Sequence, residues 1–216
     1  MMQVSANEVY QTARKACLAA GYLQDRAEDV ALASSWLHYA GFNGCGELER
    51  MLAAEMEENL TARTKLHLHV DNACLHITRL RPAYEGIAAI DWMLASSNRA
   101  QVRIDKILHP LMVAGLLWRS GLIYQKQFRL EADGLSSAIL LPDTAPGQLA
   151  EISALPDRVV IWPDKDISMQ MSAPSGPCKV DKQIWQSLNS LAAQTYVPET
   201  ESSRLSGAGA GLVDND

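Results

Sequence analysis

The stretch "SANEVYQTARKACLAAGYLQDRAEDVALASSWLHYAG", residues 5–41, decides how the chain begins to fold. Ser5 with a glutamate three residues later forms a capping box, which predicts the start of a helix. Apolar residues then recur at helical spacing. Gly21 is placed to end this helix, because glycine tolerates the left-handed conformation that follows a helix. Asp25 repeats the start signal and Gly41 the stop signal, so the stretch predicts two consecutive helices.

Outward from these helices, the chain alternates between helical and strand-like segments. A third helix is expected from about Gly44 to Glu58, and a closing helix begins at Asp181. Between them, alternation of period two predicts a hairpin within residues 66–77 and a strand at 101–108. Further strands are expected at residues 122–132, 136–142, 157–163 and 167–172.

This order favours an α+β fold, with an N-terminal three-helix segment packed on a mixed or antiparallel sheet, one C-terminal helix and an extended tail. We expect residues 1–195 to form a single domain and residues 196–216 to form a Gly/Ala-rich tail.

Composition limits the classes of function. The 216 residues carry a net charge of −6, which argues against a nucleic-acid partner because such proteins present a basic face. No apolar run has the length of a membrane span, and no signal peptide is visible at the N-terminus, so we expect no membrane association. The four cysteines are widely scattered, as is typical of free thiols in a reducing compartment. The sequence therefore predicts a cytoplasmic protein.

A predicted hairpin within "KLHLHVDNACLHITRL", residues 65–80, carries the first candidate site. If Asp71-Asn72 is its two-residue turn, alternation places four potential ligands on one face. Nitrogen and sulfur ligands of this kind suit zinc. The alternative is a solvated polar face without a metal. The four candidate metal ligands are His67, His69, Cys74 and His76.

The N-terminal helical stretch of residues 4–52 and the segment "EGIAAIDWMLASSNRAQVRIDKILHPLMVAGLLWRSGLIY" resemble the malate/L-lactate dehydrogenase-like oxidoreductases. The resemblance covers roughly the first 125 residues and implies descent from NAD(P) enzymes that lack the Rossmann fold. That family has an Asp-Ser-His-Gly turn whose histidine takes part in chemistry. Here Cys45 stands at that position, and His109 is the retained histidine of the second motif. A Cys–His pair can form an activated thiolate when the two side chains are within hydrogen-bond reach, so Cys45 and His109 are the candidate catalytic residues.

The end of the chain, "TYVPETESSRLSGAGAGLVDND", resembles the signature of a family of uncharacterised proteobacterial proteins. That family implies no activity, cofactor or substrate for this chain.

The Gly/Ala run of this tail does not fit a phosphate-binding loop, because no helix follows the glycines and two aspartates close the chain. Disorder is one alternative, since termini fray unless they are held. The other is a docked strap, because apolar residues at wide spacing offer anchors. The predicted docking residues are Tyr196, Arg204, Leu205 and Leu212.

Two functions follow from these observations. The first is a non-catalytic accessory or assembly protein whose tail docks on its own core, on a protein partner or on a second copy. The second is a small-molecule binder or oxidoreductase-related enzyme with a degenerate site. No motif indicates a cofactor or a substrate, so the sequence leaves open whether the protein is an enzyme.

Overall fold

The computed structural model describes residues 1–57, 68–96, 100–132, 138–142, 150–153, 158–168 and 176–195. The predicted tail residues Tyr196, Arg204, Leu205 and Leu212, together with His67, lie outside the described residues.

The chain begins with a short strand and three helices: β1 (Met2–Ser5), α1 (Ala6–Ala19), α2 (Gln24–Tyr39) and α3 (Gly44–Met56). The capping box is confirmed, because the Ser5 hydroxyl accepts from the Glu8 N–H while Glu8 Oε2 accepts from the Ser5 N–H. Gly21 and Gly41 follow α1 and α2 with φ of +88° and +89°, as the sequence predicts.

The start of α2 differs from the prediction. The helix begins at Gln24 with Leu23 as N-cap, and no side chain caps it. Asp25 lies in the first turn, where its Oδ1 accepts from the N–H of Arg26. A carboxylate in the first turn still favours this end of the helix electrostatically.

The middle of the chain forms a mixed sheet and the helices that cover it. The strands are β2 (Leu68–Asp71), β3 (Cys74–Ile77), β4 (Gln101–Ile104), β5 (Lys126–Ala132), β6 (Ile139–Leu141) and β7 (Val159–Asp166). Their order is β2-β3-β4-β7-β5-β6, in which only the β3–β4 pair is parallel. The predicted α+β class with a mixed sheet is confirmed.

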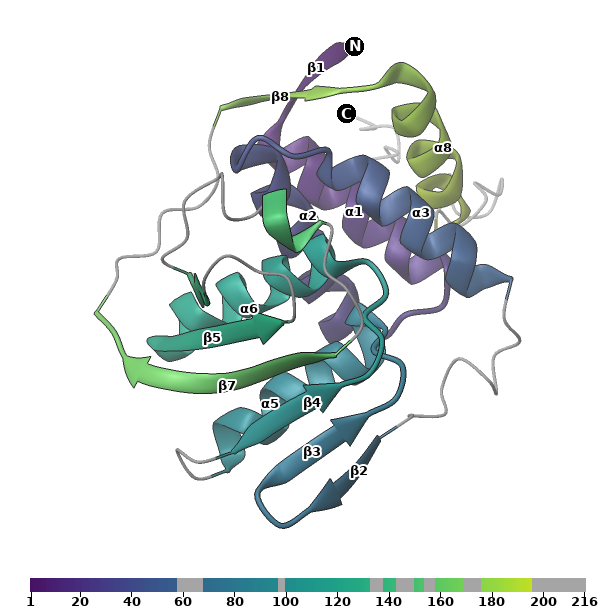
Figure 1. Cartoon of the computed structure of the whole chain (residues 1–216). Coiled ribbons are helices and arrows are strands. Elements are labelled where there is room, and N and C mark those ends of the chain that lie inside the picture. Colours follow the sequence, from purple (N-terminus) through teal and green to yellow (C-terminus); the bar gives the residue numbers. More distant parts are fainter. Residues whose placement is uncertain are drawn as a thin grey trace, which may run out of the picture.

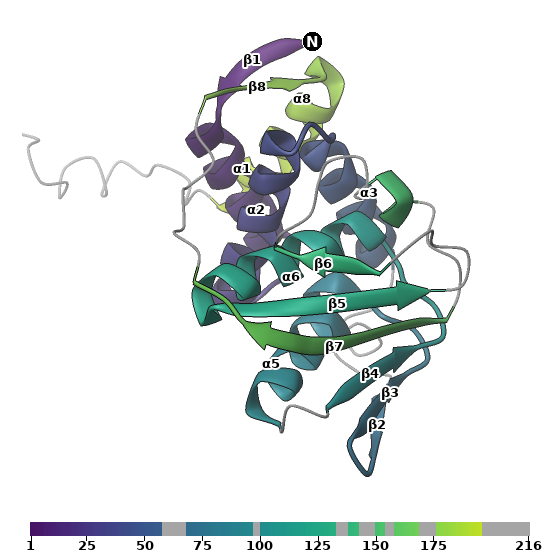
Figure 2. The ribbon, with the colours of Figure 1, turned by 60° about the vertical axis from the view of Figure 1, so that its left-hand side comes forward.

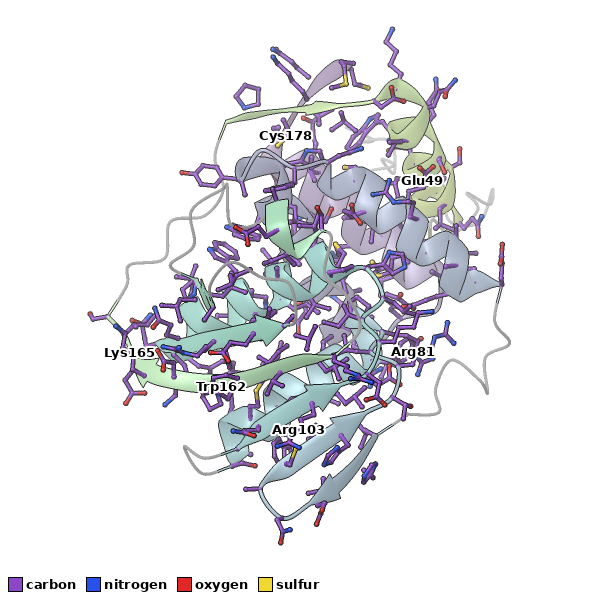
Figure 3. All side chains as sticks on the ribbon, viewed as in Figure 1. Glu49, Arg81, Arg103, Trp162, Lys165 and Cys178 are labelled. Carbon is purple, nitrogen blue, oxygen red and sulfur yellow. The ribbon has the colours of Figure 1, made fainter. Side chains whose placement is uncertain are left out.

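Two helices cover one face of this sheet: α5 (Ile87–Ala95), which follows the π-helix η1 (Pro82–Gly86), and α6 (Pro110–Tyr124). Alternate strand residues such as Leu75, Val102, Phe128 and Ile161 are buried toward them. The opposite face carries more polar side chains, among them Arg103 of β4, labelled in Figure 3, and Arg129 of β5, which is paired with Trp162 of β7. Helix α2 packs on α6, so the N-terminal helices reach the sheet through α6.

The last elements return to the N-terminal helices. Strand β8 (Pro177–Val180) pairs antiparallel with β1, and α8 (Lys182–Ala192) packs on α1 and α3 before the short 3-10 helix η2 (Ala193–Thr195). Figures 1 and 2 show α1, α2, α3 and α8 gathered at one end of the molecule, above the sheet. The Asp181 side chain accepts from the N–H groups of Gln183 and Ile184, which confirms its predicted role as N-cap.

The hairpin turn differs from the prediction. The two turn residues are Asn72 and Ala73, not Asp71 and Asn72, because Asp71 pairs with Cys74. Asn72 takes the left-handed conformation, with φ of +52°. The Ala73 carbonyl accepts from the N–H of Gln101, so pairing with β4 extends to the turn. The register moves by two residues, and an even shift leaves each side chain on the face that alternation predicts.

Candidate functional site

The turn between α2 and α3 brings together residues that the sequence did not connect. Asn43 is the N-cap of α3, and its Oδ1 accepts from the N–H of Gly46 at 3.0 Å. His38, in the last turn of α2, accepts the N–H of Cys45 with its Nε2 at 2.9 Å. With Nε2 as the acceptor, the neutral imidazole carries its proton on Nδ1.

These hydrogen bonds leave the first turn of α3 without a free donor. The N–H groups of Gly44 and Glu47 donate to the carbonyls of Phe42 and Asn43, and those of Cys45 and Gly46 donate to side chains. A helix N-terminus binds phosphate through such N–H groups when they are free. This helix end is therefore self-capped.

Strand β8 forms the other wall of a pocket of about 440 Å³ beside this turn. Its polar lining comes from His38 and Asn43 on one side and from Lys179 and Asp181 on the other. Cys178 lies at the pocket on β8 (Figure 3). The pocket thus offers a histidine, an amide, one cation and one carboxylate to a small polar ligand.

Cys45 and His109, the predicted catalytic pair, each have other neighbours in the structure. Cys45 is fully buried, and burial, followed by the proximity of Cys178 and Glu49, raises the pKa of its thiol to about 12. The charged neighbours of His109 are Glu47 and Arg50, and burial is the main cause that lowers the pKa of this histidine. Among the hydrogen bonds of the described residues, none joins Cys45 to His109. The thiol is protonated at neutral pH in this environment, and its role as a nucleophile stays a prediction.

His38→Gln is expected to reduce the pH dependence of stability. Burial lowers the pKa of His38 from 6.5, so the folded state favours the neutral ring. The stability that the neutral His38 ring contributes is complete above pH 6.5 and is lost as the pH falls through the folded-state pKa of His38. Glutamine can still accept the Cys45 N–H through Oε1 but does not titrate. Urea unfolding between pH 7.5 and pH 5 should therefore show a smaller loss of stability for the variant.

The control for this measurement is His38→Ala, which removes the acceptor as well as the titrating group. It should be less stable than His38→Gln at every pH. A His38→Gln profile parallel to that of the unsubstituted protein would contradict the assignment.

The hairpin places part of the predicted metal set together. The rings of His69 and His76 stack with centroids 4.8 Å apart and planes at 9°, and Cys74 lies near the turn on the same face. Over the described ranges, no group of three or more His, Cys, Asp or Glu side chains has a geometry that could hold a metal ion. His67 lies outside these ranges, so the four-ligand site stays a prediction.

A buried ion pair was not predicted. Arg81 and Glu85 are 1% and 0% exposed, at the start of η1. The guanidinium donates from Nε to Glu85 Oε2 at 2.9 Å and from Nη2 to Oε1 at 2.7 Å, a bidentate pair. The Arg81 N–H also donates to Oε2 at 3.1 Å. The spacing of four was visible in the sequence, but such pairs are common on helix surfaces, so burial could not be inferred.

Aromatic residues extend this pair into the helical layer. The Arg81 guanidinium lies over the ring of Tyr84, 4.7 Å from its centroid, and Arg26 of α2 approaches the same ring at 4.9 Å. Tyr22 meets Tyr84 edge to face at 5.7 Å and donates its hydroxyl to Glu55 of α3. The cluster therefore joins η1 to α2, to α3 and to the turn after α1. Arg81 is labelled in Figure 3.

An apolar groove of about 290 Å³ runs between α3 and α8. Leu52 and Met56 of α3 face Leu188 and Leu191 of α8 across it, and Gln194 of η2 lies at its edge. Glu49 lies on α3 beside α8 (Figure 3) and lines the groove as its only charged residue among those described.

Residues 4–103 match the family model described as Protein of unknown function (DUF3726). The match confirms that this chain carries a domain of unknown function. No curated protein and no solved structure matches the chain.

The DUF3726 match covers α1, α2, α3, the hairpin and the Arg81–Glu85 pair. His109, β8 and the tail lie outside it. Two resemblances stay predictions. One is the resemblance of the C-terminal signature to the uncharacterised proteobacterial family. The other is the resemblance of the first 125 residues to the malate/L-lactate dehydrogenase-like oxidoreductases. None of the described helices combines the length with the apolar character that a membrane span requires.

Proposed function

We propose that this protein is a non-catalytic accessory or assembly protein that acts through its C-terminal tail, residues 196–216. The groove between α3 and α8 is the observation that carries this proposal. It exposes apolar side chains at the end of the fold where the tail begins, two residues after Gln194. An open apolar surface of this kind favours a docked segment.

The chemistry of three of the four cysteines supports a non-catalytic role. Cys17, Cys45 and Cys178 are buried, and burial raises the pKa of each thiol. Reactive thiols in proteins have a lowered pKa and are partly exposed. We further propose that the protein is cytoplasmic, that residues 1–195 form one domain and that the tail binds a protein partner or a second copy.

The pocket beside His38 favours a second candidate, a small-molecule binder related to the dehydrogenases. Asn43 lines this pocket. It lies in the turn in which Cys45 stands where the dehydrogenases have a catalytic histidine. No residue of this pocket has a lowered thiol pKa or a metal-binding arrangement among the residues described. The candidate therefore rests on the shape and polar lining of the pocket.

One experiment separates the two candidates. The full chain and its Arg204→Glu and Leu205→Asp variants are used as baits under the same conditions, and light scattering measures their size. The proposal predicts that a partner or a self-association seen with the full chain falls at least tenfold with either variant. Tyr39→Ala, which changes a side chain 64% exposed on α2, is the control and should bind as the full chain does.

Binding that is identical in all four proteins would contradict a role for the tail. Labelling with a thiol reagent then addresses the second candidate. Rapid modification of Cys45 in the folded protein at pH 7 would favour an activated thiol, whereas we expect Cys45 to react only after unfolding.

A further inference from the structure

We propose that Tyr196 and Val197, the first two residues of the tail, dock in the groove between α3 and α8. This inference rests on the proposed function, because it divides the tail into a part that anchors and a part that binds. The remaining residues, 198–216, then extend from a fixed point on the core.

The groove has an apolar floor and a polar rim. Leu52 and Leu188 form the buried floor, whereas Met56 is 46% exposed and Leu191 is half-buried. The rim carries Glu49 and the hydroxyl and amide groups of Ser187, Ser190 and Gln194. An aromatic ring with a hydroxyl suits such a site, because its body is apolar and its tip can hydrogen-bond.

The position of η2 determines which part of the tail can reach the groove at the lowest entropic cost. Gln194 lines the groove, and the hydroxyl of Thr195 donates to the carbonyl of Ala192, so the chain is held up to the last residue before Tyr196. Docking Tyr196 and Val197 therefore orders only two more residues. Leu205 and Leu212 are nine and sixteen residues further along, and holding them there would order or close a much longer segment.

Residues 58–67 also begin near the groove, because α3 ends at Met56. Their composition, and the position of the strand that follows them, make these residues a poorer occupant of the groove. The chain continues from Glu57 with Glu58 and Asn59, which are polar, and it must reach β2 at the edge of the sheet. Figure 1 shows β2 at the opposite end of the molecule from α8.

Glu49 gives the groove a second means of holding Tyr196. Among the described residues Glu49 forms no ion pair, although it is half-buried. A carboxylate on the rim can accept a hydrogen bond from a phenol. Tyr196→Phe should therefore dock more weakly than the unsubstituted chain but better than Tyr196→Ala.

Hydrogen exchange of the full chain tests the proposal. In Tyr196→Ala/Val197→Ala we expect the amides of residues 49–56 and 187–194 to exchange at least tenfold faster, a change of about 1.4 kcal/mol in local opening. The matched control is Leu205→Ala/Leu212→Ala, which removes two apolar side chains from the same tail and should leave these rates unchanged. Circular dichroism confirms that both variants stay folded.

Four results would overturn the proposal. Unchanged exchange in Tyr196→Ala/Val197→Ala would mean that neither residue occupies the groove. Faster exchange in the control variant would assign the groove to the distal tail. A further variant, Leu60→Ser, tests residues 58–67, and faster exchange in this variant alone would assign the groove to that segment. Protection that rises with protein concentration would assign it to a second copy. The proposed function fails separately, because it depends on Arg204 and Leu205 and is measured by binding.

Discussion

Arg81→Met is expected to lower the free energy of unfolding by about 3–5 kcal/mol. The substitution removes two charge-assisted hydrogen bonds from Glu85, whose side chain is fully buried at 0% exposure. The remaining carboxylate would have lost its bidentate partner in a region from which water is excluded. Since small domains have about 5–15 kcal/mol of stability in total, this loss is large. The urea midpoint at pH 7 measures it.

The double variant Arg81→Met/Glu85→Met is the decisive comparison. It removes both charges and fills the same volume with apolar groups, so it should be more stable than Arg81→Met alone. Arg26→Met is the matched control, because Arg26 lies over the same ring of Tyr84 but is only half-buried and makes one longer hydrogen bond, 3.3 Å to the Ala83 carbonyl. We expect it to cost about 1 kcal/mol. Equal losses for Arg81→Met and Arg26→Met would show that the buried pair has no special role.

Gly44→Ala is expected to destabilise the protein by about 3 kcal/mol or more, because overpacking at a backbone contact cannot be relieved by a rotamer change. A Cβ at this position would lie 2.0 Å from the carbonyl oxygen of Ser34 and 3.1 Å from Leu37 Cβ. Helices α2 and α3 would have to separate, which would also displace the N–H of Cys45 from His38. Thermal or urea unfolding measures the loss.

Gly86→Ala is the matched control for this substitution. A Cβ at Gly86 meets its nearest atoms at 3.5 Å or more, an ordinary contact, and Gly86 has a helical φ of −62°. Alanine there should change stability by less than about 1 kcal/mol, since it is accommodated and restricts the unfolded chain. If Gly44→Ala proves as mild as Gly86→Ala, the close approach of α2 and α3 is not required for stability.

Local sequence signals account for the starts and ends of several helices in this fold. The capping box at Ser5, the left-handed residues Gly21 and Gly41 and the cap at Asp181 were all predicted, because each signal acts within a few residues of the chain. The face of the hairpin that carries His69, Cys74 and His76 followed from alternation alone. The α+β class followed from the order of these elements.

Contacts between side chains that are far apart in the sequence depend on how whole elements pack. The register of the hairpin depends on β4, whose Gln101 N–H reaches the Ala73 carbonyl. The contact of His38 with Cys45 depends on the turn geometry between two packed helices. No local pattern encodes either contact, because each is set by the packing of whole elements.

The cluster around Arg81 and Glu85 shows most clearly how local sequence signals differ from contacts that depend on packing. Arg81 and Glu85 are four residues apart, a spacing that the sequence displays, yet their burial depends on Tyr22, Tyr84 and Glu55 converging from distant segments. The free energy of an ion pair at this spacing differs between water and the protein interior, because the cost of desolvating the two charges depends on the groups that surround them. Its surroundings are a property of the assembled core, and the sequence around Arg81 does not contain them.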